Sequence, residues 1–183
     1  SYRGSNSYRY RLHIGSFPRP RVVVPSGGQA GKSVEFTFLG DPKGPFKKTI
    51  TLPDDGSDIL AYHPEENGLF APSPNNIKIS NFPSIQEVEP NNGIKEATRT
   101  HLSIPLGLNG VIEKEGDIDY FRFQAKKGDR YYIKGHARSV ASPLDPVLNL
   151  YHGDGKSIRG NDDGGNGPDS LITQTFPKDG EYV

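Results

Sequence analysis

The chain has 183 residues, of which 22 are glycine, 16 are proline and none is cysteine. This composition favours many short strands joined by turns, and the lack of cysteine excludes disulfides, thiolate metal sites and cysteine nucleophiles. The 22 basic and 22 acidic residues give a formal net charge of zero, which argues against a nucleic-acid partner. No apolar run approaches the roughly 20 residues of a membrane-spanning helix, so we expect no membrane insertion.

Apolar and polar residues alternate with a period of two along much of the chain, which is the pattern of half-buried β-strands. In residues 33–39, for example, Val34, Phe36 and Phe38 share one face. Many short strands at this spacing predict an all-β fold of sandwiches or barrels. The predicted strands, in chain order, are Tyr8–Ile14, Val22–Val24, Ser33–Leu39, Thr49–Leu52, Ile77–Ser80, Leu108–Ile112, Tyr120–Ala125, Arg130–Ala137, Val147–Tyr151 and Leu171–Phe176.

The segment Asn81–Asn92 is the best candidate for a domain boundary, because it is mostly polar and contains Pro83 and Pro90. An apolar content of 32% suits two small β-sandwiches better than one deep core. A strand near each end of the chain looks incomplete, so we expect the natural protein to continue on both sides. The predicted order is a strand without a partner in residues 1–19, a sandwich at 20–82, an acidic linker at 83–92 and a second sandwich at 93–183.

Motifs for catalysis and for nucleotide binding are absent or incomplete. Residues 27–33 resemble a phosphate-binding loop, but the loop is one residue short and an alternating strand follows it where a helix is needed. The five histidines are scattered, and neither an HExxH pair nor a GxSxG elbow occurs. A Ser-His-Asp set assembled only by the fold would leave no such motif. We expect the chain not to be an enzyme.

Two acidic segments carry the most informative chemistry. Glu87 and Glu89 lie two residues apart, so their carboxylates point to the same side of an extended chain, and Pro90 stiffens the backbone after them. Asp117 and Asp119 repeat this spacing. Calcium prefers several carboxylate and amide oxygens, whereas zinc and copper favour nitrogen and sulfur ligands, which are lacking. The other interpretation is a polar linker and an acidic turn. The candidate calcium ligands are Glu87, Glu89, Asn91, Asn92, Asp117 and Asp119.

A further acidic group lies towards the C-terminus, where Asp162 and Asp163 follow Asn161. The sequence leaves two interpretations open. One is a second metal site formed by Asp145, Asp162 and Asp163, and the other is a set of Asx turns. Residues 164–172 also fit one copy of a calcium-binding nonapeptide, but that repeat binds calcium only in stacked copies, so we expect a glycine-rich hairpin loop there.

From about Glu87 to Val183 the chain resembles the bacterial pre-peptidase C-terminal domain. EVEPNN at 87–92 is similar to the opening motif of that family, and GDIDYFRF at 116–123 is similar to its central strand. Further motifs follow in the same order, with KGD at 127–129, LDPVLNLY at 144–151, NDD at 161–163 and DGEY at 179–182. The resemblance implies a jelly-roll-like β-sandwich, which occurs as an accessory domain on secreted bacterial enzymes and in large surface proteins.

The resemblance also bears on the metal site and on the flanking modules. Calcium in collagenase relatives lies between the acidic linker and the DxD turn, which nominates the same six residues here. The last strand of the family is expected beyond Val183. Residues 20–40 resemble the start of an immunoglobulin-like domain of the TIG type, and Tyr8–Gly15 is similar to the closing strand of another pre-peptidase-type domain. Such an array resembles planctomycete-type surface or secreted proteins.

Two functions are expected from this organisation. The first is a non-catalytic extracellular structural or adhesive spacer, with a linker stabilised by calcium and neighbouring β-sandwich modules of the same chain as partners. The second is an accessory module of a secreted hydrolase that binds substrate, either protein fibres or polysaccharide. A row of exposed tyrosines such as Tyr132 or Tyr151 would favour the second function. Both imply an extracytoplasmic location, which is secreted, periplasmic or at the cell surface.

Overall fold

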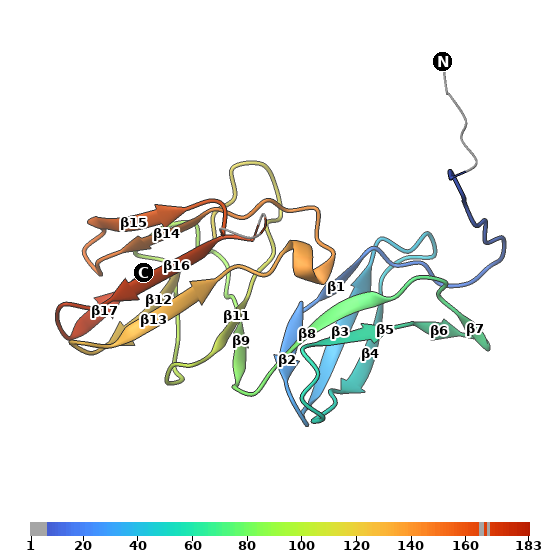
Figure 1. The fold of residues 1–183 in the computed structure, drawn as a ribbon, viewed down its shortest axis with the longest axis horizontal. Coiled ribbons are helices and arrows are strands. Elements are labelled where there is room, and N and C mark those ends of the chain that lie inside the picture. Colours follow the sequence, from blue (N-terminus) through green and yellow to red (C-terminus); the bar gives the residue numbers. More distant parts are fainter. Residues whose placement is uncertain (1–6, 165–166, 168) are drawn as a thin grey trace, which may run out of the picture.

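A computed structural model describes residues 7–164, 167 and 169–183. Within these residues the chain is all-β apart from one 3₁₀ turn, η1 (Arg138–Val140). The strands form two β-sandwich domains that follow one another along the chain (Figure 1). This confirms the predicted fold class. None of the described helical residues forms a helix long and apolar enough to cross a membrane.

The N-terminal domain packs two three-stranded sheets against each other. The first sheet is antiparallel, in the order β1 (Val22–Val24), β3 (Ser33–Leu39) and β4 (Phe46–Thr51). The second has the order β2 (Gly27–Gln29), β8 (Asn75–Ser80) and β5 (Ile59–Tyr62), with β2 parallel and β5 antiparallel to β8. A small hairpin of β6 (Glu65–Glu66) and β7 (Leu69–Phe70) follows β5.

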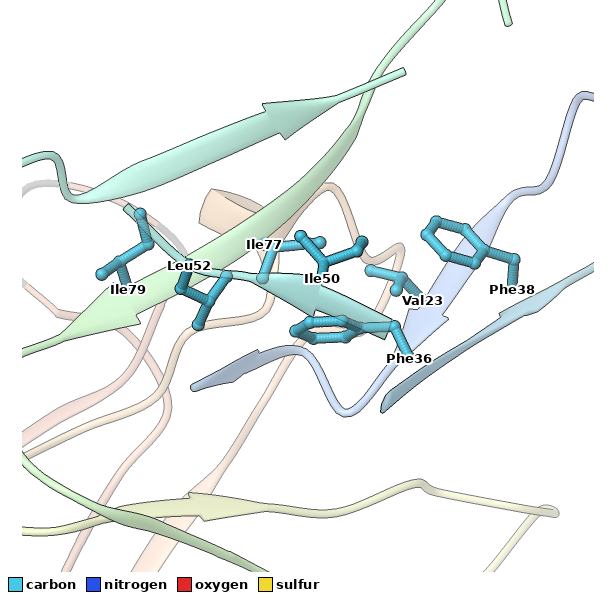
Figure 2. Close-up of a cluster of buried hydrophobic side chains, with 7 residues drawn as sticks. All are labelled: Val23, Phe36, Phe38, Ile50, Leu52, Ile77 and Ile79. Atoms are coloured by element: carbon cyan, nitrogen blue, oxygen red, sulfur yellow. The ribbon is translucent and has the colours of Figure 1, made fainter. Parts of the chain in front are cut away.

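The core of this domain lies between the two sheets. Phe36 and Phe38 of β3 are fully buried, and the residues between and beside them face outward, as the alternation predicted. Figure 2 shows how they meet side chains from the neighbouring strands. The buried cluster consists of Val23, Phe36, Phe38, Ile50, Leu52, Ile77 and Ile79.

The C-terminal domain is built from four small sheets. Two strands near its start pair in parallel with later strands, β9 (Ser84–Gln86) with β11 (Gly107–Asn109) and β10 (Thr98–Arg99) with β12 (Phe121–Ala125). The remaining pairs are antiparallel, namely β12 with β17 (Gly180–Tyr182), β13 (Arg130–Lys134) with β16 (Leu171–Thr175), and β14 (Leu148–Tyr151) with β15 (Ser157–Asn161). Its core contains Ala125, Leu150, Ile172, Phe176 and Tyr182.

Within the described part of the chain, strands or turns of the two domains lie close together at two places. Strand β2 of the first domain lies beside β9 and β11 of the second, where the Ser26 hydroxyl donates a hydrogen bond to Asn109 Oδ1 at 3.2 Å. The turn η1 lies against β8, and Figure 1 shows it in orange beside the N-terminal domain. Residues 84–86 of the predicted linker are strand β9, so this part of the linker is held on the C-terminal domain.

Most predicted strands are present, some with different ends. The prediction of a strand at Tyr8–Ile14 is wrong, because a strand needs a partner for its backbone groups and the described part of the chain offers none there. The predicted strand Arg130–Ala137 ends at Lys134. The strand predicted at Leu108–Ile112 ends at Asn109 in the structure. Beyond it, the Val111 amide donates a hydrogen bond to the Glu87 side chain instead of to a neighbouring strand. The glycine-rich nonapeptide at 164–172 lies partly outside the described residues.

Candidate metal centre

The two acidic segments meet beside Gly110, which directly follows β11. Glu87 directly follows β9, and its backbone amide donates a hydrogen bond to the Asn109 carbonyl at 2.9 Å, which continues the pairing of β9 with β11. Asp119 lies just before β12. Tyr120 N–H donates to the Asn91 carbonyl at 3.1 Å, so the segment after the two glutamates is fixed beside Asp119.

Three carboxylates converge at this point. Oxygen atoms of Glu87, Glu89 and Asp119 all lie within 4.8 Å of one another. Two oxygens bound to one calcium ion lie at most about 5 Å apart, since each bond is roughly 2.3–2.6 Å long. Glu87 and Asp119 are half-buried and Glu89 is exposed. The geometry therefore fits a single calcium ion with an opening to solvent on the side of Glu89.

The electrostatics of this cluster are unfavourable without a cation. Burial, a hydrogen bond with Glu87 and the charges of Glu87, Asp117 and Glu89 together raise the pKa of Asp119 to about 7. Among the described residues, no lysine or arginine forms an ion pair with these carboxylates. The negative charge of the cluster is thus available to a divalent cation.

Asn91 is the most buried residue of the site, with no exposed surface. Its backbone amide donates to Glu89 Oε2 at 2.9 Å, and its side-chain nitrogen donates to Glu87 Oε2 at 3.3 Å and to Thr98 Oγ1 at 3.4 Å. Among the described residues, neither its Oδ1 atom nor Asp119 Oδ1 has a hydrogen-bond partner. A buried oxygen left unpaired costs about 1–3 kcal/mol. Two such oxygen atoms at one cluster suit the coordination of a cation.

Gly110 closes the site from the side of β11. A Cβ atom at this position would lie 2.3 Å from Asp119 Oδ2 and 2.7 Å from Glu87 Oε2, so only glycine allows the backbone to pass. The next residue, Val111, donates its amide to Glu87 Oε1 at 2.6 Å. Sequence reasoning assigned no role to Gly110 or to Thr98.

The other two predicted ligands lie on the edge of the cluster. Asn92 is exposed, and its Oδ1 accepts the Ile118 amide at 3.2 Å. Asp117 Oδ2 accepts the Glu113 amide at 2.7 Å. Both side chains therefore fix the loop before β12, and neither belongs to the group of three converging carboxylates. Their role as calcium ligands stays a prediction.

The second acidic group is not brought together in the same way. Asp145, Asp162 and Asp163 are exposed, and none belongs to a group of three converging acidic or histidine side chains among the described residues. Asp154 Oδ1 accepts the Lys156 amide at 3.0 Å, which is an Asx turn. A second ion site here stays a prediction, and counting the calcium ions bound by the wild type and by Asp163→Asn would test it.

Comparison with known proteins gives one informative similarity. No family model and no solved structure matches the chain. A stretch of 99 residues is 36% identical to part of a probable subtilase-type serine protease of Deinococcus radiodurans. The match covers 54% of this chain and 14% of that protease. The similarity is therefore to one small segment of a much longer protein.

Proposed function

We propose that the chain is a non-catalytic accessory part of a secreted protease, whose C-terminal domain is of the pre-peptidase C-terminal type and is stabilised by calcium. The partial similarity to a subtilase-type protease supports the protease context. The order of motifs from Glu87 onward supports the domain type. An extracytoplasmic location, with free calcium in the surrounding medium, follows from this context.

The observation that carries the calcium proposal is the pairing of a carboxylate cluster with an unpaired buried amide oxygen. Glu87, Glu89 and Asp119 would hold the ion, and the Asn91 carboxamide lies beside them with Oδ1 unpaired. Ligands of this kind suit calcium. Bound calcium would neutralise charges that otherwise repel one another.

Calcium at this site would stiffen the connection between the domains. Glu87 joins the end of β9 to the Val111 amide, and the adjacent Asn109 accepts a hydrogen bond from Ser26 of the first domain. An ion that fixes Glu87 would thus fix the backbone that carries the junction. This is the spacer function expected from the sequence, with neighbouring modules of the same chain as partners.

Binding of polysaccharide by an aromatic platform has less support. Tyr132 is 68% exposed on β13 and has the Arg130 guanidinium 5.6 Å from its ring centre. Tyr151 lies on β14, in a different sheet, and its ring packs 6.2 Å from that of Tyr120. Tyr132 and Tyr151 therefore lie in different sheets and do not form one row of exposed aromatic side chains.

Thermal unfolding of the whole chain in EDTA and in millimolar calcium tests the proposal. If calcium is present at about a hundred times its dissociation constant, binding adds about 2.7 kcal/mol, and the Tm should rise by roughly 10–20 °C for a domain of about 100 residues. Magnesium should substitute poorly, because it demands a tighter octahedral site.

Three variants give the measurement its controls. Glu89→Gln and Asp119→Asn should abolish most of the calcium-induced rise in Tm, because each removes a charged ligand. Glu115→Gln should leave the rise intact, since Glu115 is an exposed acid on the neighbouring loop and lies outside the cluster. If the Tm of the wild type does not change when calcium is added, the calcium proposal is wrong and this cluster is only a polar linker and an acidic turn.

A further inference from the structure

Thr98 is a buried residue that contacts both acidic segments. It is the first residue of β10 and is only 6% exposed. Its backbone N–H donates a hydrogen bond to the Tyr120 carbonyl at 2.8 Å, as part of the parallel pairing of β10 with β12. Tyr120 directly follows Asp119. The backbone of Thr98 is therefore attached to the segment that carries the third carboxylate of the cluster.

The side chain of Thr98 contacts the other acidic segment. The Val88 amide donates to Thr98 Oγ1 at 2.9 Å, and the Thr98 hydroxyl donates to the Val88 carbonyl at 3.3 Å. Val88 stands between the two glutamates, and its own side chain is 67% exposed. In an extended chain, Glu87 and Glu89 direct their side chains to the side opposite that of Val88. One hydroxyl therefore fixes the backbone of the residue that both glutamates flank.

The same hydroxyl also reaches the buried amide of the site. Asn91 Nδ2 donates to Thr98 Oγ1 at 3.4 Å and to Glu87 Oε2 at 3.3 Å. A hydroxyl has one hydrogen to donate and two lone pairs to accept with, so its contacts with Val88 and Asn91 use its whole capacity. Val88 and Thr98 are ten positions apart. Their hydrogen bonds close a loop that contains Glu89 and Asn91.

We propose that Thr98 is the positioning residue of the calcium site. It holds the segment of Glu87 and Glu89 at the distance from Asp119 at which one ion can be bound, although it does not bind the ion itself. Like charges a few ångströms apart repel one another, so the carboxylates would separate if nothing joined the two segments. The inference rests on the proposed calcium site and assigns it a residue outside the set of ligands.

A purely structural role for Thr98 predicts a different result. Hydrogen bonds that only stabilise the fold would change the Tm in EDTA and leave the calcium affinity of the folded chain unchanged. A positioning residue changes that affinity, because the ligands must be brought together again each time the ion binds. Side chains that orient metal ligands typically account for about 10–100-fold in metal affinity.

Isothermal titration of the whole chain with calcium separates these two roles. Thr98→Val keeps the shape of the side chain and removes the hydroxyl, so the Kd for calcium should rise by roughly 10–100-fold. Thr98→Ser keeps the hydroxyl and should bind calcium nearly as tightly as the wild type. Melting curves in EDTA show the temperature below which each variant is folded, and the titrations are carried out there.

Thr100→Val is the matched control for the loss of a hydroxyl. Thr100 lies two residues further on, so its side chain is on the same side of the extended backbone, and it is partly buried. Within the described part of the chain, its hydroxyl makes no hydrogen bond to either acidic segment. Its Kd for calcium should equal that of the wild type. An equal loss of affinity in Thr100→Val and Thr98→Val would contradict the assignment.

Hydrogen exchange of the Val88 amide tests the contact itself without calcium. In EDTA this amide should be protected in the wild type and in Thr98→Ser, because it donates to the hydroxyl. It should lose this protection in Thr98→Val. The measurement on the wild type needs no variant, so it decides the question even if Thr98→Val does not fold. A Val88 amide that exchanges as fast as an unstructured one would overturn the proposal.

The titrations distinguish a failure of this inference from a failure of the calcium proposal. If the wild type shows no saturable calcium binding, the proposed function is wrong and Thr98 has no ion site to position. If the wild type binds calcium and a folded Thr98→Val chain binds it equally well, only the role of Thr98 is wrong. Weak binding by Thr98→Ser, at the level of Thr98→Val, would also exclude the hydroxyl as the cause.

Discussion

A methyl group added at Gly110 should disrupt the metal centre from its backbone side. In Gly110→Ala the new Cβ would lie 2.3 Å from Asp119 Oδ2 and 2.7 Å from Glu87 Oε2. Ordinary carbon contacts are about 3.5–4.0 Å long, so both carboxylates must move by roughly 1 Å. Neither can do so freely, because Val111 donates to Glu87 and Asp119 is half-buried.

Gly110→Ala should cause two separate losses, one of folding stability and one of calcium binding. Overpacking of this kind costs about 1–3 kcal/mol, which lowers the Tm of a domain of about 100 residues by roughly 4–24 °C even in EDTA. Metal ligands tolerate displacements of only about 0.2 Å. A carboxylate displaced by roughly 1 Å therefore loses the ion, and the rise in Tm on adding calcium should shrink to a small fraction of the wild-type value.

Differential scanning calorimetry in EDTA and in calcium measures both losses. Gly93→Ala is the matched control, because a Cβ at Gly93 meets nothing closer than the flexible end of Glu96, at 3.4 Å. The control should melt within a few degrees of the wild type and keep its calcium response. If Gly110→Ala behaves like Gly93→Ala in both buffers, the carboxylates do not converge on Gly110 and the assignment of the site is wrong.

Three further predictions concern the rest of the chain. Arg122→Leu should cost about 3–5 kcal/mol in urea unfolding, since the buried guanidinium binds Glu181 and two backbone carbonyls. Asp169 accepts amides of η1, which lower its pKa although burial raises it. Asp169→Asn should therefore cost about 1 kcal/mol near neutral pH, and the difference should vanish as the pH falls from about 4 through the lowered pKa. The purified chain should hydrolyse neither casein nor starch, and activity lost on mutating one serine or histidine would contradict this.

Alternation predicted the strands of the N-terminal core well, because one face of each is buried. Ser33–Leu39 was predicted with its observed ends, and Phe36 and Phe38 are the buried residues of its apolar face. Strands β9 and β10 escaped prediction, since two or three residues cannot display a period. Tyr8–Ile14 shows the opposite error. Its alternation is clear, yet Tyr8, Tyr10, Leu12 and Ile14 are 71–93% exposed and pair with no described strand.

The candidate site could be predicted only as far as its charged side chains. The i, i+2 spacing indicated Glu87, Glu89 and Asp119 because carboxylates two residues apart point to the same side of an extended chain. The unpaired oxygen of Asn91 and the close approach of Gly110 depend on contacts between segments about 20 residues apart. Backbone geometry of this kind has no residue signature beyond a glycine, and the chain has 22 of those.

The segment 109–112 connects the candidate metal centre with the domain junction. Asn109 accepts a hydrogen bond from Ser26 of the first domain, and the Val111 amide donates to Glu87. A short backbone segment held at both ends has few ways to move. An ion bound by Glu87 would therefore also restrain the backbone that joins the two domains.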